Sequence, residues 1–347
     1  MQRLDLVTSE EVNRIWSMRT WLRMILPILL SLLAGSILIL ADGKNPIATY
    51  FNLFDAGFSC QPGPGRCALV TTLQFATPLV LNGLAALIAM RGGYLSIGQY
   101  GQMLFGALAA SWIGSQIQLP VFIHPAFALL GAALLGGLWG LLPGLLKHFL
   151  GVSEIISTLL LNPIAGVLVG LSRLPGIMNS AKLEPLISST KLSAGIFLAV
   201  GMILVVFIYL FRTTQGLEIR TTADAPRFSV FGGMPKHLPA LLPMVLSGAM
   251  AGLAGGVEVL GVHYHFISSF SAVNEFDGLI IALAGHLHPI GVLFFAILVG
   301  GLRAGAIVGL QIRSGVPREL GGALVAMMLI FIATIQISKK RQTSDGL

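Results

Sequence analysis

The sequence predicts an all-α fold, a polytopic transmembrane helical bundle of about ten spans, with eight to ten compatible with the pattern. Hydrophobic residues make up 55% of the 347 residues and charged residues only 10%, whereas a soluble domain carries about 25% charged residues. Apolar runs of about 20 residues, the length a helix needs to cross a bilayer core, recur along the chain. Because these runs lack the alternation of membrane β-strands, helices are expected.

The expected elements begin with a polar cytoplasmic lead-in at residues 1–21, followed by a transmembrane domain at 22–338 and a basic cytoplasmic tail at 339–347. The first apolar run is about 18 residues long and lacks a small-residue cleavage site, so it is expected to remain as a span and not as a signal peptide. The predicted spans are Met24–Ala41, Ala68–Met90, Ile97–Gln116, Val121–Leu146, Ile155–Leu171, Leu192–Phe211, Leu238–Val262 and Leu320–Ile337.

The region Phe276–Gln311 is apolar but is interrupted by His286, His288, Pro289 and Arg303. It is expected to hold either one long and one short span, or two spans. Lys and Arg flank the apolar runs, and the positive-inside rule then places both termini in the cytoplasm. This placement requires an even number of crossings, so two spans in the interrupted region would give a total of about ten.

The polar stretch Asp42–Cys67 contains Pro62-Gly63-Pro64-Gly65 and is expected to be rich in turns. It also holds both cysteines of the chain, Cys60 and Cys67. If this stretch faces an oxidising compartment, the two cysteines can form a disulfide that closes a small loop. Two free thiols are an equally good interpretation of the sequence alone.

Three sets of glycines recur at every fourth residue. This spacing puts the glycines of a set on one helical face, where two backbones can approach closely. Helix packing is the simpler interpretation, and a surface on which helices slide between two states is the alternative. The three stripes are Gly136, Gly140 and Gly144; Gly248, Gly252 and Gly256; and Gly301, Gly305 and Gly309.

Polar side chains inside the predicted spans are costly in lipid and therefore mark candidate functional positions. Gln99 and Gln102 stand at the start of a span beside several glycines, and Asn162 lies in the middle of another. Glu258 is deep inside a span, where it either contacts a solute or pairs with an internal arginine such as Arg303.

Asp277 lies at the mouth of the interrupted region, where it could line a vestibule or simply start a solvated helix. Two His-x-His pairs, His263 with His265 and His286 with His288, have the spacing of some metal ligands. No cysteine or carboxylate constellation completes either pair, so no metal is expected.

Enzymatic chemistry and nucleic-acid binding are not expected. The sequence contains no Gly-x-x-x-x-Gly-Lys-Ser/Thr loop, no nucleophile elbow and no zinc-protease helix. The net charge of +7 comes from Lys and Arg beside the apolar runs, without an aromatic-interleaved basic stripe that would indicate nucleic acid.

Four glycine-rich segments carry a resemblance: GYLSIGQYGQMLFGA at 93–107, GVSEIISTLLLN at 151–162, SGAMAGLAGGVEVLG at 247–261 and FDGLIIALAG at 276–285. In this order they resemble permease subunits of ABC importers of the branched-chain amino acid/ribose/nucleoside class, and most closely the nucleoside (simple-sugar) branch. Ser96 and Tyr100 stand where this family usually has Asn and Glu. The solute, whether a nucleoside, a sugar or an amino acid, therefore stays open.

The resemblance also implies a role for the basic segment 212–237. In the family, the corresponding segment is a cytoplasmic coupling loop whose short helix docks in a groove of the ATPase subunit. A positive-inside loop without that role is the alternative. The residues expected to contact or position the ATPase are Gly216, Arg220, Asp224, Arg227, Phe228, Phe231 and Gly232.

The resemblance implies a multi-pass protein of the bacterial cytoplasmic (inner) membrane, surrounded by lipid, that moves solute by alternating access. Its expected partners are an ATP-binding ABC subunit, a second permease subunit that is identical or related, and an extracytoplasmic solute-binding protein. ATP and Mg belong to the partner ATPase, and no cofactor is expected on this chain. The solute pathway is expected to include Gln99, Gln102, Asn162, Glu258 and Asp277. The alternative is a proton-coupled secondary transporter in which Glu258, Asp277 or a histidine carries the proton.

Overall fold

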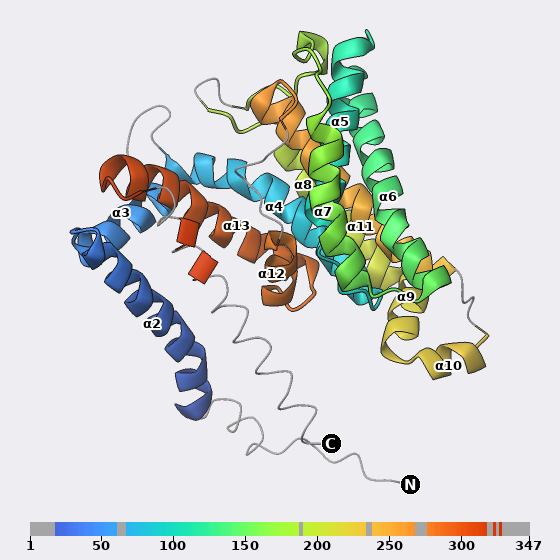
Figure 1. Ribbon diagram of the computed structural model, residues 1–347, viewed down its shortest axis with the longest axis horizontal. Coiled ribbons are helices and arrows are strands. Elements are labelled where there is room, and N and C mark those ends of the chain that lie inside the picture. Colours follow the sequence, from blue (N-terminus) through green and yellow to red (C-terminus); the bar gives the residue numbers. More distant parts are fainter. Residues whose placement is uncertain are drawn as a thin grey trace.

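The structure is a computed structural model that describes residues 18–60, 67–186, 190–233, 238–267 and 276–317, with 322–323 and 326–327 beyond them. Within these ranges the regular elements are helices, which confirms the predicted all-α fold (Figure 1). The elements are α2 (Met18–Ala41), α3 (Pro46–Phe58), α4 (Ala68–Arg91), α5 (Gln99–Gln116), α6 (His124–Leu150), α7 (Glu154–Gly170), η1 (Asn179–Ala181), α8 (Gly195–Arg212), α9 (Thr214–Asp224), α10 (Pro226–Phe231), α11 (Leu238–Glu258), η2 (Val259–His263), α12 (Asp277–Ala284), α13 (Pro289–Gly305) and η3 (Ala306–Arg313).

Most predicted spans correspond to one helix each. In the described part of the chain, 5 helices are long and apolar enough to cross a membrane, and α7 is a shorter apolar helix. The predicted lead-in 1–21, the last span Leu320–Ile337 and the tail 339–347 lie wholly or almost wholly outside the described residues. The long apolar helices are Ala68–Arg91, His124–Leu150, Gly195–Arg212, Leu241–His263 and Pro289–Arg313.

The stretch between the first two spans differs from the prediction because it contains helix α3. Asn45 caps this helix: its side-chain oxygen accepts hydrogen bonds from the backbone N–H groups of Ile47, at 3.0 Å, and Ala48, at 3.4 Å. Proline at the first helical position suits such a start. The prediction of a turn-rich loop is therefore wrong for residues Pro46–Phe58, which form a helix. The side chain of Leu53 in this helix is fully buried.

The interrupted region contains α12, a turn at residues 285–288, and α13 continued by η3. The 8 residues of α12 span about 12 Å, too short to cross a hydrocarbon core of about 30 Å. The region therefore holds one long and one short element, which is the first of the two alternatives. It does not contain the two full spans on which the total of about ten rested.

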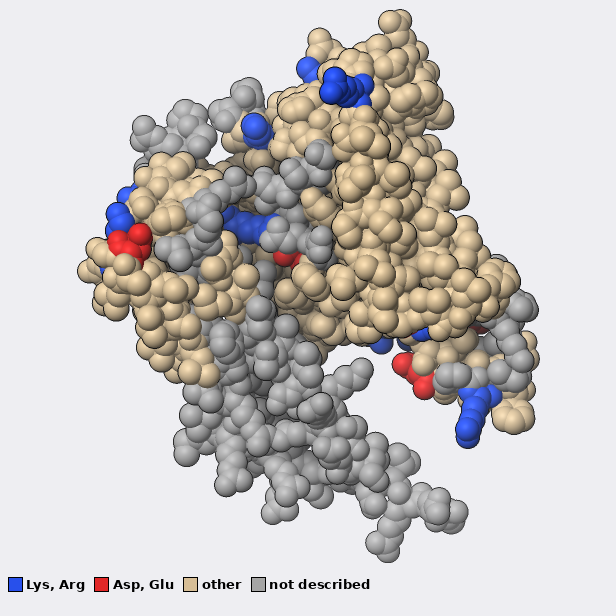
Figure 2. Space-filling view, viewed as in Figure 1, with Lys and Arg blue, Asp and Glu red and all other residues tan. Residues whose placement is uncertain are grey.

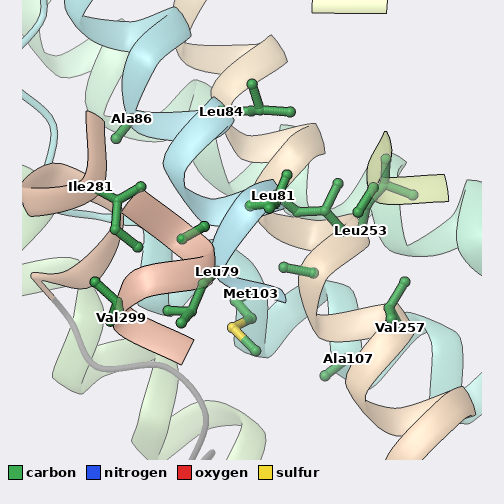
Figure 3. Packing of buried hydrophobic residues seen from close by; sticks show 14 of the residues in the cluster. Leu79, Leu81, Leu84, Ala86, Met103, Ala107, Leu253, Val257, Ile281 and Val299 are labelled. Carbon is green, nitrogen blue, oxygen red and sulfur yellow. The ribbon is translucent and has the colours of Figure 1, made fainter. Parts of the chain in front are cut away.

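Helix α4 is the centre of the bundle and contacts α3, α8, α11, α12 and α13. Every residue from Ala76 to Ala89 is buried, as expected for a helix that is apolar on all sides. Figure 3 shows this helix packed against Met103 of α5, Leu253 of α11, Ile281 of α12 and Val299 of α13. The half-length helix α12 thus lies directly against the central helix.

All three glycine stripes pack helices together. The stripe on α6 faces the stripe on α11, because a Cβ placed on Gly136 would lie 2.5 Å from the carbonyl oxygen of Gly248. The third stripe, on α13 and η3, packs against α3, since a Cβ on Gly309 would lie 2.7 Å from the carbonyl carbon of Asn52. Real side chains do not tolerate such approaches, so glycine is required at these contacts. The packing interpretation of the stripes is confirmed.

The outer face of α6 is apolar and exposed. Leu130, Leu134 and Leu138, one helical turn apart, are 62%, 69% and 59% exposed. Figure 2 shows a broad surface over α6 and α7 without charged residues, with Lys, Arg, Asp and Glu gathered toward its ends. A continuous apolar face of this kind suits contact with lipid or with another membrane-embedded subunit.

Candidate functional site

Asn162 joins α7 to the start of α5. Its Nδ2 donates a hydrogen bond to the carbonyl of Ile97, and its Oδ1 accepts one from the N–H of Gly101, both at 2.9 Å. One turn earlier on α7, Thr158 accepts from the N–H of Ile97 at 3.2 Å. Asn162 is 1% exposed, so its buried amide is paired with backbone groups at a helix start that would otherwise lack partners. This predicted pathway residue holds the start of α5 in place.

Gln99 and Gln102 lie beside this junction, and each is 1% exposed. Gln99 donates from Nε2 to the carbonyl of Ser96 at 3.0 Å. Among the described residues, the Oε1 atoms of both glutamines and the indole Nε1 of Trp139 on α6 have no hydrogen-bond partner. Buried polar atoms without partners are costly. The α5–α6 contact therefore offers acceptors and a donor that a polar solute or water could use if these helices separated.

Glu258 occupies a different region, at the end of α11. It is 2% exposed, and its carboxylate lies 3.2 Å from Nε2 of His263, across the π-helical turn η2. The alternative that Glu258 pairs with an internal arginine such as Arg303 is therefore wrong, because its partner is His263. Near the end of α5, a Cβ on Gly114 would lie 3.4 Å from a methyl of Leu260. Since α5 rises about 1.5 Å per residue, this end of the bundle is about 20 Å from Gln99.

Asp277 and Arg303 form a buried ion pair. Asp277 is the first residue of α12, Arg303 lies in the last turn of α13, and their side chains are 3% and 8% exposed. A charge in a low-dielectric interior is tolerated when it is paired and hydrogen-bonded. The pair links the half-length helix α12 to the long helix α13 that follows it. Because Asp277 is buried, the start of α12 is not solvated, contrary to one of the two predictions for this residue. Of the five predicted pathway residues, Gln99, Gln102 and Asn162 therefore form one cluster, whereas Glu258 contacts His263 and Asp277 pairs with Arg303.

The predicted coupling segment forms two helices at the end of the bundle where α4 finishes. Thr213 caps α9, because its hydroxyl accepts a hydrogen bond from the N–H of Gly216 at 3.1 Å. A Cβ on Gly216 would lie 2.7 Å from the carbonyl oxygen of Leu210, so only glycine allows the tight turn from α8 into α9. Ile219 is 2% exposed, and α9 packs against α8 and α11.

Helix α10 presents aromatic side chains to the outside. Phe228 is 65% and Phe231 is 91% exposed. The other predicted coupling residues divide into two groups: Asp224, Arg227 and Gly232 are exposed, whereas Arg220 is partly buried. Figure 1 shows α10 at the outer edge of the molecule, beyond α9. Two exposed aromatic rings beside charged residues are typical of a protein-docking surface.

A polar cluster lies where α6 ends and α7 begins. Lys147 forms an ion pair with Glu154 at 2.7 Å, and its ammonium also lies 4.9 Å from the ring centre of Tyr94 in the loop between α4 and α5. Burial raises the pKa of the Tyr94 phenol, and the Glu154 carboxylate raises it further. The cluster ties three connections together at the same end as α9.

Sequence reasoning missed Arg91, the last residue of α4. Its guanidinium donates two hydrogen bonds, from Nε at 3.0 Å and Nη2 at 2.9 Å, to the carbonyl of Leu287 in the turn after α12. In the sequence, Arg91 carries only the signal of a basic residue at the end of a span. Nothing in the chain order indicates its partner.

The histidine pairs make local contacts. Nδ1 of His265 lies 2.7 Å from the carbonyl of His263, and Nδ1 of His288 accepts from the N–H of Ile290 at the start of α13 at 3.3 Å. In the described part of the chain, no group of three or more His, Cys, Asp or Glu residues is placed to hold a metal ion. The geometry supports loop and capping roles for His265 and His288.

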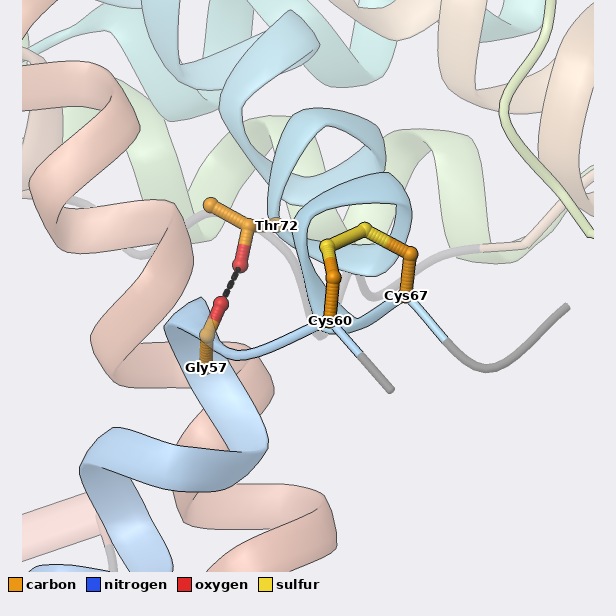
Figure 4. The surroundings of a disulfide bond; sticks show 4 residues. All are labelled: Gly57, Cys60, Cys67 and Thr72. Atoms are coloured by element: carbon orange, nitrogen blue, oxygen red, sulfur yellow. Dashed lines mark hydrogen bonds between the residues drawn. A yellow bond between two sulfur atoms is a disulfide. The ribbon is translucent and has the colours of Figure 1, made fainter. Parts of the chain in front are cut away.

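Cys60 and Cys67 are joined by a disulfide, which decides between the two interpretations of these residues (Figure 4). It closes the connection between α3 and α4. Beside it, the hydroxyl of Thr72 donates to the carbonyl of Gly57, so a second contact fastens the end of α3 to α4.

A bundle of long apolar helices with an exposed apolar face is the architecture of a multi-pass membrane protein. The chain belongs to the family described as "Branched-chain amino acid transport system / permease component", whose family model matches residues 68–333. It is therefore a permease subunit of an ABC transporter, a transport component, and not a proton-coupled secondary transporter. No solved structure gives a significant match.

Three curated relatives cover most of the chain. It is 34% identical to the guanosine ABC transporter permease protein NupP of Bacillus subtilis, over 89% of this chain and 92% of that protein. It is 30% identical to the nucleoside ABC transporter permease protein NupB of Lactococcus lactis, over 89% of both chains. It is 28% identical to the glucose ABC transporter permease protein TsgB13 of Haloferax volcanii, over 91% of this chain and 88% of that protein.

Proposed function

We propose that this permease subunit imports a nucleoside, or a chemically similar small polar solute, across the bacterial cytoplasmic membrane. The observation that carries this proposal is its similarity to the guanosine and nucleoside permeases along nearly the whole length of all three chains. The relative named for glucose is less identical and makes a sugar the second candidate class of solute.

The disulfide supports an orientation for the chain in the membrane. Disulfides persist in oxidising compartments, so the Cys60–Cys67 bond favours an extracytoplasmic position for the connection between α3 and α4. Helix α4 starts directly after Cys67 and ends 24 residues later at Arg91, a length of about 36 Å that exceeds the hydrocarbon core. Arg91 and the neighbouring helix α9 then lie on the cytoplasmic side, which is also the side that the positive-inside rule predicts for both termini.

The α9–α10 segment is the proposed contact with an ATP-binding ABC subunit. Its basic residues fit the cytoplasmic side, and the exposed Phe228 and Phe231 offer apolar anchors that a groove on a partner can bury. The energy for transport then comes from ATP and Mg bound by that partner. A second permease subunit would pack on the lipid-facing bundle, and a solute-binding protein would deliver solute to the extracytoplasmic end.

The proposed pathway passes the start of α5. Gln99 and Gln102 are its candidate solute contacts, because their buried amide oxygens have no partners among the described residues. Asn162, Glu258 and Asp277 are proposed to hold the walls of the pathway, since their side chains pair with protein groups. Alternating access would then require the helices around the two glutamines to separate.

Uptake into proteoliposomes tests this proposal. The chain would be reconstituted with the ATPase, second permease and solute-binding protein encoded beside it, and offered labelled nucleosides, hexoses, pentoses and branched-chain amino acids with and without ATP. We expect ATP-dependent uptake of nucleosides, competed by unlabelled guanosine. Uptake of a sugar alone would replace the solute class, and the absence of any ATP-dependent uptake would contradict the import function.

A further inference from the structure

The turn between α12 and α13 has an unusual backbone. His286 and Leu287, two consecutive residues with side chains, have φ values of 55° and 52°, in the left-handed region that favours glycine. Such a conformation persists only where the surroundings hold it. The contacts on this turn therefore decide whether it keeps its shape.

Arg91 holds this turn with two hydrogen bonds from outside the α12–α13 region. Both hydrogen bonds of its guanidinium go to the carbonyl of Leu287, a residue 196 positions away in the sequence. Hydrogen bonds from a charged donor are stronger than those between neutral groups. The end of the central helix α4 thus fixes the left-handed turn at the end of the half-length helix α12.

The guanidinium of Arg91 is also connected to the coupling segment, because Arg91 and Arg220 of α9 both lie beside the ring of Phe211. The guanidinium carbon of Arg91 lies 5.5 Å from the ring centre of Phe211, in the last turn of α8. Arg220 of α9 lies 5.0 Å from the same centre, and the ring centre of His288 lies 5.5 Å from it. Phe211 is therefore the point where α4, α8, α9 and the turn meet.

This contact is sensitive to the position of α9. Each guanidinium is attracted to the ring of Phe211, while the two like charges repel each other. The carboxylate of Asp224 is close enough to act on Arg91 and offsets part of that repulsion. Because Arg220 and Asp224 both belong to α9, a displacement of this helix changes the forces on Arg91.

We propose that Arg91 is a positioning residue that transmits the displacement of α9 to the turn 285–288 and so to helix α12. This inference rests on the proposed function, in which α9 and α10 contact the ATPase. When the ATPase moves α9, Arg220 moves relative to the ring of Phe211, and the guanidinium of Arg91 on the same ring moves in response. The hydrogen bonds from Arg91 to the Leu287 carbonyl then change. Helix α12, which lies against the central helix α4, then moves relative to it.

The complete reconstituted transporter tests the proposal with three variants. Arg91→Ala removes the link, and Arg91→Lys keeps a cation that can reach Phe211 and the Leu287 carbonyl. Arg173→Ala, in the segment after α7, removes an exposed arginine outside the coupling segment 212–237. We expect Arg91→Ala to lower the solute transported per ATP hydrolysed about fivefold or more while ATP hydrolysis continues. We expect Arg91→Lys to recover part of the loss and Arg173→Ala to behave as wild type.

A second measurement does not depend on how well Arg91→Ala folds. His286 is exposed, and both native cysteines are in the disulfide, so His286→Cys gives a single reactive thiol in the turn. With Arg91 present, we expect the rate of maleimide labelling at this thiol to change at least twofold when the ATPase binds ATP. An unchanged rate, or a wild-type transport ratio in Arg91→Ala, would overturn the inference. A wild-type complex without ATP-driven uptake would instead contradict the proposed function.

Discussion

Gly136 on α6 lies directly against Gly252 on α11, so that a Cβ on Gly136 would stand 2.7 Å from the Cα of Gly252. This contact joins two glycine stripes that are far apart in the sequence. It brings the backbones of two membrane helices closer than any pair of side chains would allow. A substitution at Gly136 therefore tests directly whether this close approach of α6 and α11 stabilises the bundle.

Gly136→Ala is expected to destabilise the α6–α11 contact, because the new methyl group meets backbone atoms that have no flexible end to move. Overpacking of this kind costs about 1–3 kcal/mol. Thermal unfolding of the purified protein in detergent should show a lower midpoint. The control is Gly166→Ala on α7, where a Cβ meets nothing within 4 Å. Equal stability of the two variants would contradict the packing role.

Asn162→Ala is expected to lower the free energy of unfolding by about 1–3 kcal/mol, because it leaves the Ile97 carbonyl and the Gly101 N–H without this amide. The control is Asn179→Ala, because the exposed side chain of Asn179 accepts a hydrogen bond from the side chain of Lys182 and its loss is expected to be near neutral. Uptake kinetics separate the two roles of Asn162. A raised KM for the solute at unchanged stability would make it a solute contact and not a clamp.

Replacing both Phe228 and Phe231 by alanine is expected to weaken binding of the ATPase by about tenfold or more, because exposed aromatic anchors commonly dominate such interfaces. Phe197 at the opposite end of α8 is 67% exposed, close to the 65% of Phe228, and Phe197→Ala is the matched control. Co-purification and titration of the ATPase in detergent provide the measurement. Unchanged affinity in the double variant would remove α10 from the interface.

The spans could be predicted because length and hydropathy are local properties of the chain. The predicted span Ala68–Met90 differs from α4 by a single residue. Helix α3 was missed because its apolar side is covered by the glycine stripe of α13 and η3, about 250 residues away. Only the Asn45-Pro46 pair signalled its start, and that signal also occurs in turns.

The candidate site was predictable in part for the same reason. The polarity of Gln99, Gln102 and Asn162 within apolar runs marked them, and the fold brings them together. The partners of buried charges were not predictable, because pairing depends on tertiary contacts that no spacing reveals. The arginine suggested for Glu258 pairs instead with Asp277.

The proposed orientation predicts which thiols can be reached from outside the cell. After treatment with a membrane-impermeant reductant, Cys60 and Cys67 should react with an impermeant maleimide in intact cells. Arg227→Cys introduces a thiol at an exposed position on α10. It should react only after the membrane is permeabilised. Labelling of Arg227→Cys in intact cells would invert the orientation.

The buried pair of Asp277 and Arg303 predicts strong coupling between two substitutions. Asp277→Asn leaves a buried guanidinium without this carboxylate, and Arg303→Gln leaves a buried carboxylate without this guanidinium. Removing one partner of such a pair costs about 3–5 kcal/mol. The double variant buries no net charge at this contact, so it should recover much of that loss. Thermal unfolding midpoints of the four proteins complete the cycle. Strictly additive losses would mean that the two side chains do not stabilise α12 and α13 through each other.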